Sequence, residues 1–190
     1  AGHKSYVAGR DGVNFHVMLY GTNGEGLMAV LEAGRMGQVR TGAASGLATN
    51  YMASQNASAV GIIGSGYQAE TQLEAVCAVR DVTEVKVFSR NSSNREKFAG
   101  TMGERLGVKV VATESKESAA EGVDVLIAVT NSIEPVITGG MLEPGMHVNA
   151  AGNNSWMKRE LDTAAIKKSD VIACEDRKST RLNSSHALIS

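Results

Sequence analysis

The sequence predicts an α/β protein with a doubly wound parallel sheet, preceded by part of a second, smaller α+β unit. Short apolar runs alternate with helical patterns from residue 56 onward, and a glycine-rich turn follows the first of these runs. Strands that alternate with helices imply βαβ units, which place parallel strands in one sheet. We therefore assign residues 1–55 to a partial first domain and residues 56–175 to a doubly wound domain, which we also expect to be incomplete.

The first 55 residues contain two strand patterns and one helical pattern. Residues 14–20 and 27–32 are apolar runs, and the segment between them is rich in glycine around Asn23-Gly24. This arrangement predicts a β-hairpin, because Asn-Gly readily adopts the positive φ angles of tight turns. From about residue 37 to 54 apolar residues recur every four positions, which predicts a helix.

The second region repeats a strand followed by a helix. Its apolar runs predict six strands, over residues 59–63, 84–88, 108–112, 124–129, 146–150 and 171–174. The stretches between them predict four helices, over residues 67–80, 92–106, 116–121 and 157–165. This alternation is typical of a doubly wound sheet.

The composition excludes several classes of protein. The chain has 190 residues, 43% of them hydrophobic, and a formal net charge of -1, which leaves no basic surface for nucleic acid or an anionic membrane. No apolar run reaches the roughly 18 residues of a membrane span. Cys77 and Cys174 lie in apolar runs, so we expect buried thiols and a cytoplasmic protein, and we expect no metal site.

Both ends of the chain read as cut. The chain begins at Ala1 in what reads like the middle of a protein. The segment from Asp176 to His186 resembles the translation of a sequencing adapter, so we treat residues 176–190 as a non-native tail and leave them out of the fold prediction. The alternative is a natural polar tail.

A glycine-rich turn follows the strand over residues 59–63 and opens the next helix. It consists of Gly64, Ser65, Gly66, Tyr67, Gln68 and Ala69. The first glycine permits a tight turn, the second lets the backbone approach a pyrophosphate, and the alanine lets the helix pack on the strand. The pattern and its context predict a dinucleotide-binding Rossmann fold; the alternative is a turn of the same shape without a ligand.

The end of the second strand of this sheet bears on the choice of cofactor. A site for NAD places a carboxylate there to bind the ribose hydroxyls. This chain instead has Ser89 and Arg90, followed by Asn91, Ser92 and Ser93. Because Arg90 can bind a 2′-phosphate and no carboxylate repels it, we favour NADP over NAD. The alternative is that Arg90 is an ordinary solvated residue at a helix start.

Three motifs together resemble one known family. They are residues 40–46 (RTGAASG), 61–69 (GIIGSGYQA) and 142–150 (LEPGMHVNA). In this order and spacing they are similar to the ornithine cyclodeaminase/mu-crystallin family, over residues 1–174. The resemblance implies a Rossmann domain beside a substrate and dimerisation domain, and a homodimer of the full-length protein. It also implies NAD(P)-dependent hydride transfer at the C–N bond of an amino or imino acid.

The resemblance also implies roles for individual residues. Lys4 falls at the position of the family's active-site lysine, which contacts the substrate carboxylate and helps to set protonation. Arg40 matches the arginine that binds the substrate carboxylate, which suits a planar guanidinium. The positions that wall the nicotinamide pocket in the family correspond to Thr130, Asn149, Ala150 and Ala151.

One departure from the family pattern concerns the reaction. The cyclodeaminase has a catalytic aspartate in the turn after the fifth strand, where this chain has Asn154, with Lys158 in the same turn. An amide does not exchange a proton as a carboxylate does, so we expect a reductase or dehydrogenase. The alternatives are a cyclodeaminase with a displaced acid and a non-catalytic protein that binds NADPH or a small ligand. We expect the 190-residue chain to be inactive by itself.

Overall fold

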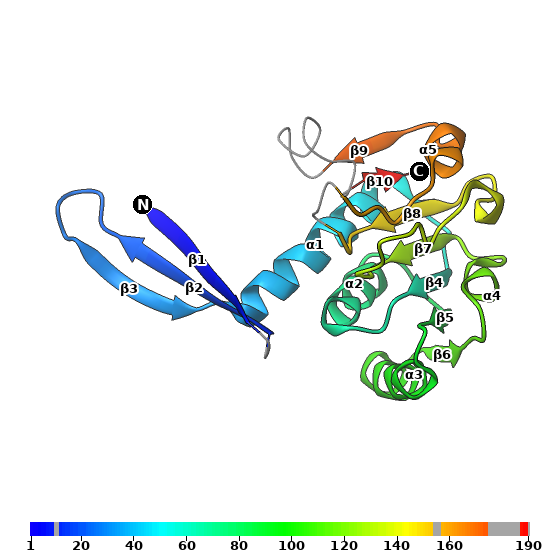
Figure 1. Ribbon diagram of the computed structural model, residues 1–190, viewed down its shortest axis with the longest axis horizontal. Coiled ribbons are helices and arrows are strands. Elements are labelled where there is room, and N and C mark those ends of the chain that lie inside the picture. Colours follow the sequence, from blue (N-terminus) through cyan, green and yellow to red (C-terminus); the bar gives the residue numbers. More distant parts are fainter. Residues whose placement is uncertain (10–11, 154–156, 175–186, 190) are drawn as a thin grey trace. The chain divides into compact units, whose positions relative to one another are not determined.

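The structure, a computed structural model, describes residues 1–9, 12–153, 157–174 and 187–189 (Figure 1). Its contacts divide the chain into two compact units, Ala1–Arg40 and Thr41–Ser190. The division falls inside helix α1 (Gly34–Met52), whereas the sequence analysis set the boundary after that helix, at residue 55.

The first unit contains a three-stranded antiparallel sheet in the order β1-β2-β3. The predicted hairpin is confirmed as β2 (Gly12–Tyr20) paired with β3 (Leu27–Glu32). The sequence analysis missed β1 (Gly2–Gly9), which pairs with β2 from Gly2↔Leu19 onward. Glycines at both ends of β1 and the polar residues His3, Lys4 and Ser5 hide its period, and its pairing comes from the backbone of β2.

The second unit is built on a sheet in the order β6-β5-β4-β7-β8-β10-β9 (Figure 1). Its five parallel strands are β4 (Ala59–Ile63), β5 (Glu84–Phe88), β6 (Lys109–Ala112), β7 (Val125–Ala128) and β8 (His147–Ala150). The helical elements are α2 (Tyr67–Cys77), α3 (Ser92–Leu106), α4 (Lys116–Ala120), the short η1 (Gly139–Met141) and α5 (Thr163–Lys168). The doubly wound fold is confirmed.

Alternate residues of the central strands fill two separate cores. On β4 and β7, Val60, Ile62 and Ile127 point to the face covered by α2 and α3. Ile63 and Leu126 point to the opposite face, which α4 and α5 cover. Both faces of β4 and β7 are therefore buried, which explains why these two strands read as continuous apolar runs.

The helix expected over residues 157–165 is wrong before Thr163. Helix α5 starts only at Thr163, because the side chain of Asp162 caps it by accepting a 2.6 Å hydrogen bond from the N–H of Ala165. The preceding residues are held by strand-like bonds instead: Leu161 forms a parallel bridge with Ile137. This isolated bridge lies next to Glu160, whose carbonyl oxygen accepts hydrogen bonds from the N–H groups of Val136 and Ile137.

The far edge of the sheet carries two antiparallel additions. The predicted sixth strand is β9 (Ile172–Cys174), which pairs with β10 (Ala187–Ile189) rather than with β8. Strand β10 in turn pairs with β8. Leaving all of residues 176–190 out of the fold was therefore wrong for these three residues, because strand pairing uses backbone groups that no hydrophobic period reveals. Residues 175–186 and 190 lie outside the described residues, and a non-native origin stays a prediction.

Candidate functional site

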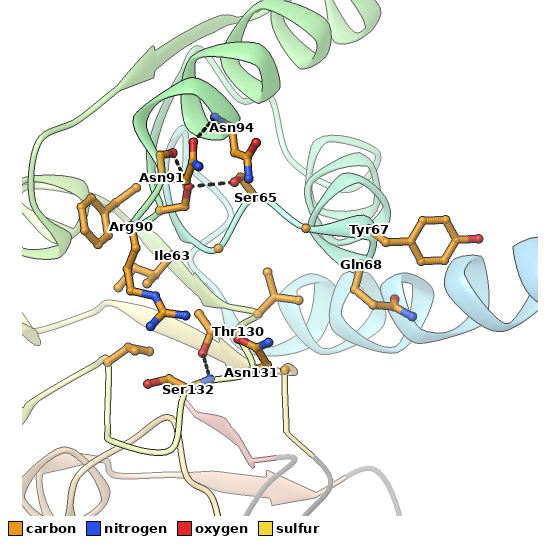
Figure 2. Close-up of a pocket in the computed structure, with 17 residues that line it drawn as sticks. Ile63, Ser65, Tyr67, Gln68, Arg90, Asn91, Asn94, Thr130, Asn131 and Ser132 are labelled. Carbon is orange, nitrogen blue, oxygen red and sulfur yellow. Dashed lines mark hydrogen bonds between the residues drawn. The ribbon is translucent and has the colours of Figure 1, made fainter. Parts of the chain in front are cut away.

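A pocket of about 780 Å³ opens at the carboxyl ends of the central strands (Figure 2). It is lined by the glycine turn after β4, the end of β5 and the segment after β7. Strand β4 connects to β5 on one side, and β7 lies on its other side, so the pocket sits where the strand order reverses. Ligands of open α/β sheets bind at this switch point, and the volume is typical of a small-molecule site.

Two glycines shape the turn in different ways. Gly64 has φ +117°, and a Cβ there would lie 2.4 Å from the carbonyl oxygen of Val129 on the neighbouring chain segment. Gly66 faces open space, since an ideal Cβ would meet no atom of the described residues within 4 Å. Behind the turn Ala69 is fully buried, which brings α2 onto β4. The turn is therefore packed at Gly64 and open toward a ligand at Gly66.

The start of α2 faces this open space. Its N-cap is Gly66, and no described side chain caps the helix. The first turn thus presents backbone N–H groups and the positive end of the helix dipole, which favour a phosphate. Gln68, in the same turn, has a buried Oε1 atom with no hydrogen-bond partner among the described residues. The side chain of Tyr67 points away from the pocket (Figure 2).

The end of β5 supplies hydroxyl and amide groups. The hydroxyl of Ser65 donates a 2.9 Å hydrogen bond to Ser89, whose hydroxyl donates to the carbonyl of Asn91 at 3.1 Å. Arg90 is exposed, and its side chain extends from this edge toward Thr130 and Ser132 across the pocket (Figure 2). Among the described residues that line the pocket, Arg90 carries the one formal charge. The lining is therefore suited to an anion.

The ends of β7 and β8 are joined by a buried carboxylate that the sequence analysis missed. Glu160 is 3% exposed and accepts hydrogen bonds from the N–H of Thr130 (2.6 Å), the hydroxyl of Thr130 (2.8 Å) and the N–H of Gly152 (2.6 Å). Burial raises the pKa of Glu160, and these three hydrogen bonds oppose the rise. No sequence signal marks Glu160, because Thr130 lies thirty positions away.

Part of the predicted cofactor site lies elsewhere. Gly64 to Gln68, Ser89, Arg90 and Thr130 line the pocket as expected. The predicted residues at the end of β8 do not line it: Asn149, Ala150 and Ala151 are buried and absent from the lining, whereas the next residue, Gly152, lines the pocket.

The side chain of Asn149 turns into the protein interior. It donates a 2.9 Å hydrogen bond to the hydroxyl of Thr49 and pairs with His147 at 3.2 Å. The resemblance to the family implied that Asn149 lies in the wall of the nicotinamide pocket. Alternation along β8 instead directs this side chain toward α1, and a cofactor role for residues 149–151 stays a prediction.

The remaining predicted residues lie outside the pocket lining. Lys4 is on β1 in the first unit, with its Nζ 5.5 Å from the centre of the Phe15 ring, and Arg40 is an exposed residue of α1. Lys158 is half-buried. Asn154 lies outside the described residues. The roles of these four residues stay predictions.

Two further properties hold for the described part of the chain. It contains no helix that is both long enough and apolar enough to cross a membrane. It also contains no group of three or more His, Cys, Asp or Glu side chains that could hold a metal ion.

The strand order, the glycine turn and the pocket at the switch point define a Rossmann-type domain. The chain belongs to the ornithine cyclodeaminase/mu-crystallin family, whose sequence model matches residues 4–188. The resemblance stated from the three motifs is therefore confirmed.

Individual proteins and solved structures are also similar to this chain. Delta(1)-pyrroline-2-carboxylate reductase of Bacillus cereus is 34% identical over 89% of this chain and 52% of its own length. The structure of the Thermococcus litoralis enzyme of that name, in complex with NADH and L-proline, is 39% identical with TM-score 0.80, over 83% of this chain and 49% of that one. An archaeal alanine dehydrogenase dimer with bound NAD is 31% identical with TM-score 0.87, and the match covers 98% of this chain and 58% of that one. The chain spans about half the length of the curated relatives it matches.

Proposed function

We propose that the protein is an NAD(P)-dependent oxidoreductase that transfers hydride at the C–N bond of an amino or imino acid. The observation that carries this proposal is the pocket at the switch point, with Gly66 open to a ligand and the start of α2 aimed at it. The similar structures named above bind NADH with L-proline, or NAD, which supports both the cofactor class and the substrate class.

The residues of the pocket fit a dinucleotide. The first turn of α2 would hold the pyrophosphate, and the buried Oε1 of Gln68 needs a hydrogen-bond donor such as a hydroxyl or amide of the ligand. The nicotinamide ring, when bound, supplies or accepts the hydride. The chain itself binds and orients it, and the apolar side chains of Ile63, Val129 and Val136 exclude water from part of the pocket.

We further propose NADP rather than NAD as the preferred cofactor. The β5 end carries Ser89, held by Ser65, where an NAD site carries a carboxylate. Arg90 gives the lining a positive charge that suits a 2′-phosphate. Expected partners are a small amino or imino acid and, for the full-length protein, a second copy of itself; the proposed location is the cytoplasm.

On the substrate side the proposal assigns the family roles to two residues of the first unit. Lys4 would contact the substrate carboxylate and help to set protonation, and Arg40 would bind the same carboxylate through its guanidinium. Asn154 stands where the cyclodeaminase has its aspartate, and this substitution favours one-step reduction or oxidation over cyclodeamination.

The test begins with titration of the chain and of its full-length parent with NADPH and NADH. We expect tighter binding of NADPH, and loss of that preference in Arg90→Ala but not in the control Lys167→Ala, which removes an exposed cation of α5. The full-length protein is then assayed with cyclic imines, and with α-keto acids plus amine. NADPH-dependent reduction of an imine supports the proposal.

Two other results would replace the proposed oxidoreductase activity with a different function. Conversion of ornithine to proline and ammonia without net cofactor turnover would identify a cyclodeaminase. Tight NADPH binding without reduction of any substrate in the panel would identify a binding protein. Turnover by the 190-residue chain alone would contradict the expectation that it is inactive.

A further inference from the structure

The strands β7 and β8 separate at the edge of the sheet that forms the pocket. Their parallel pairing ends at Ala128↔Ala150, and the last backbone bond between them runs from the N–H of Ala151 to the carbonyl of Ala128. Two residues beyond that last pair, the N–H groups of Thr130 and Gly152 find no strand partner. Both N–H groups bind the carboxylate of Glu160 instead, at 2.6 Å each.

Glu160 is itself held in place by the backbone. Its carbonyl oxygen accepts hydrogen bonds of 2.9 Å from the N–H groups of both Val136 and Ile137. Val136 also lines the pocket. The backbone of Glu160 is therefore fixed next to Val136 and Ile137. Its carboxylate bridges Thr130 and Gly152, which follow β7 and β8 and line the same pocket.

The chemistry of this contact requires a carboxylate and a glycine. Three donors converge on two oxygen atoms, which an ionised carboxylate accommodates and a carboxamide does not, because its nitrogen is a donor. A Cβ on Gly152 would lie 2.2 Å from the nitrogen of Thr130 and 2.5 Å from Oε1 of Glu160. The segments that follow β7 and β8 therefore lie so close together that a side chain at position 152 would clash with the backbone of Thr130.

The position of this contact in the sheet relates it to one half of the ligand. The glycine turn after β4 lies in the middle of the pocket, with Ser89 and Arg90 of the β5 edge on one side. Strands β7 and β8 lie on the other side of β4, where Thr130 and Gly152 line the cavity. If the adenosine half occupies the β5 side, the nicotinamide half faces the contact made by Glu160.

We propose that Glu160 is a positioning residue that joins the ends of β7 and β8 and so sets the shape of the pocket wall for the nicotinamide half of the cofactor. This inference rests on the proposed function, because it presupposes a dinucleotide in the pocket. Glu160 acts through Thr130 and Gly152 and does not contact the ligand. A pocket wall that is already ordered raises the affinity for the cofactor, because binding then loses no conformational entropy in ordering it.

The test compares a whole cofactor with its adenosine half. NADPH and 2′,5′-ADP are titrated against the wild-type chain, Glu160→Gln, Thr130→Val and the control Glu104→Gln, an exposed carboxylate of α3. If NADH is the tighter ligand, NADH and 5′-AMP replace this pair. Thermal midpoints without ligand report on folding. Thr130→Val removes one donor at nearly constant volume, so it remains informative if Glu160→Gln does not fold.

We expect Glu160→Gln to weaken NADPH binding by about tenfold or more, since hydrogen bonds to a charged group are lost. The affinity for 2′,5′-ADP should stay within about twofold, because that fragment stays on the β5 side of the turn. Thr130→Val should change the affinities in the same direction by less, and Glu104→Gln should change neither.

The inference is overturned if Glu160→Gln binds NADPH like the wild type, or if both ligands lose affinity equally, as general damage to the fold would produce. A wild-type chain that binds neither ligand contradicts the proposed function itself. The two failures are thus separate results of one titration series.

Discussion

The hydroxyl of Ser65 in the glycine turn donates a 2.9 Å hydrogen bond to the hydroxyl of Ser89 at the end of β5. This contact links the segment expected to hold the pyrophosphate with the segment expected to hold the adenosine ribose. Both groups are neutral, so the rim of the pocket at this point carries no negative charge that would repel a third phosphate.

The substitution Ser89→Asp tests the cofactor preference. A carboxylate at this position is expected to weaken NADPH binding by at least about tenfold through repulsion of the 2′-phosphate, while NADH binding is maintained or improved. Dissociation constants from fluorescence titration measure the change. Ser89→Ala is the matched control, because it removes the bond to Ser65 without adding charge. Equal affinities of the two variants for NADPH would contradict the prediction.

The glycines of the turn are expected to respond differently to alanine. Gly64→Ala should lower the free energy of unfolding by about 1–3 kcal/mol, because φ is +117° and the new Cβ would lie 2.4 Å from the oxygen of Val129. Gly66→Ala should change it by no more than about 1 kcal/mol, since φ is -85° and the space is open.

The variants Gly64→Ala and Gly66→Ala also separate effects on the free energy of unfolding from effects on cofactor affinity. Gly66→Ala should weaken cofactor binding by about tenfold or more, because the added methyl group enters the space that the pyrophosphate of the ligand needs. Urea unfolding measures the first quantity and cofactor titration the second. A Gly66→Ala chain that binds NADPH like the wild type would show that the ligand does not approach this turn.

Glu160 should give the stability a pH dependence. Burial raises the pKa of this carboxyl above its ordinary value of 4.5. A group whose pKa is raised on folding stabilises the fold fully below its unfolded pKa, and loses that contribution as the pH rises through the folded pKa. From pH 4.5 upward, the wild type should therefore lose unfolding free energy relative to Glu160→Gln, which does not titrate.

Urea unfolding of both chains across this pH range measures the difference. Glu104→Gln, which replaces an exposed carboxylate, serves as the control and should follow the wild type. A constant difference between the wild type and Glu160→Gln at every pH would mean that the pKa of Glu160 is the same in the folded and unfolded chains.

The thiol of Cys77 should resist modification. Burial raises the pKa of Cys77 to about 11, so the reactive thiolate is scarce at pH 8. In a Cys174→Ser background, Ellman's reagent should label the folded chain at least about a hundredfold more slowly than the urea-unfolded chain. Similar rates in the two states would place Cys77 at an accessible surface.

Local patterns in the sequence determined the strands, the hairpin and the glycine turn. Apolar runs predicted β4 and β7 because both faces of these central strands are buried, whereas β5 alternates Val85 and Val87 with charged residues. The strand, turn and helix around Gly64 and Gly66 occupy neighbouring positions in the chain, so the motif is complete in the sequence. The family, too, followed from motifs of this local kind.

The tertiary structure decided what depends on residues far apart in the chain. It added β1 and β10, whose pairing lies in the backbone of their neighbours, and it moved the start of α5 to Thr163. It turned Asn149 toward Thr49 and brought Gly152 to the pocket. Glu160 meets Thr130 across thirty positions, and a periodic pattern describes only residues that are close in sequence, so only the folded chain brings this carboxylate to the site.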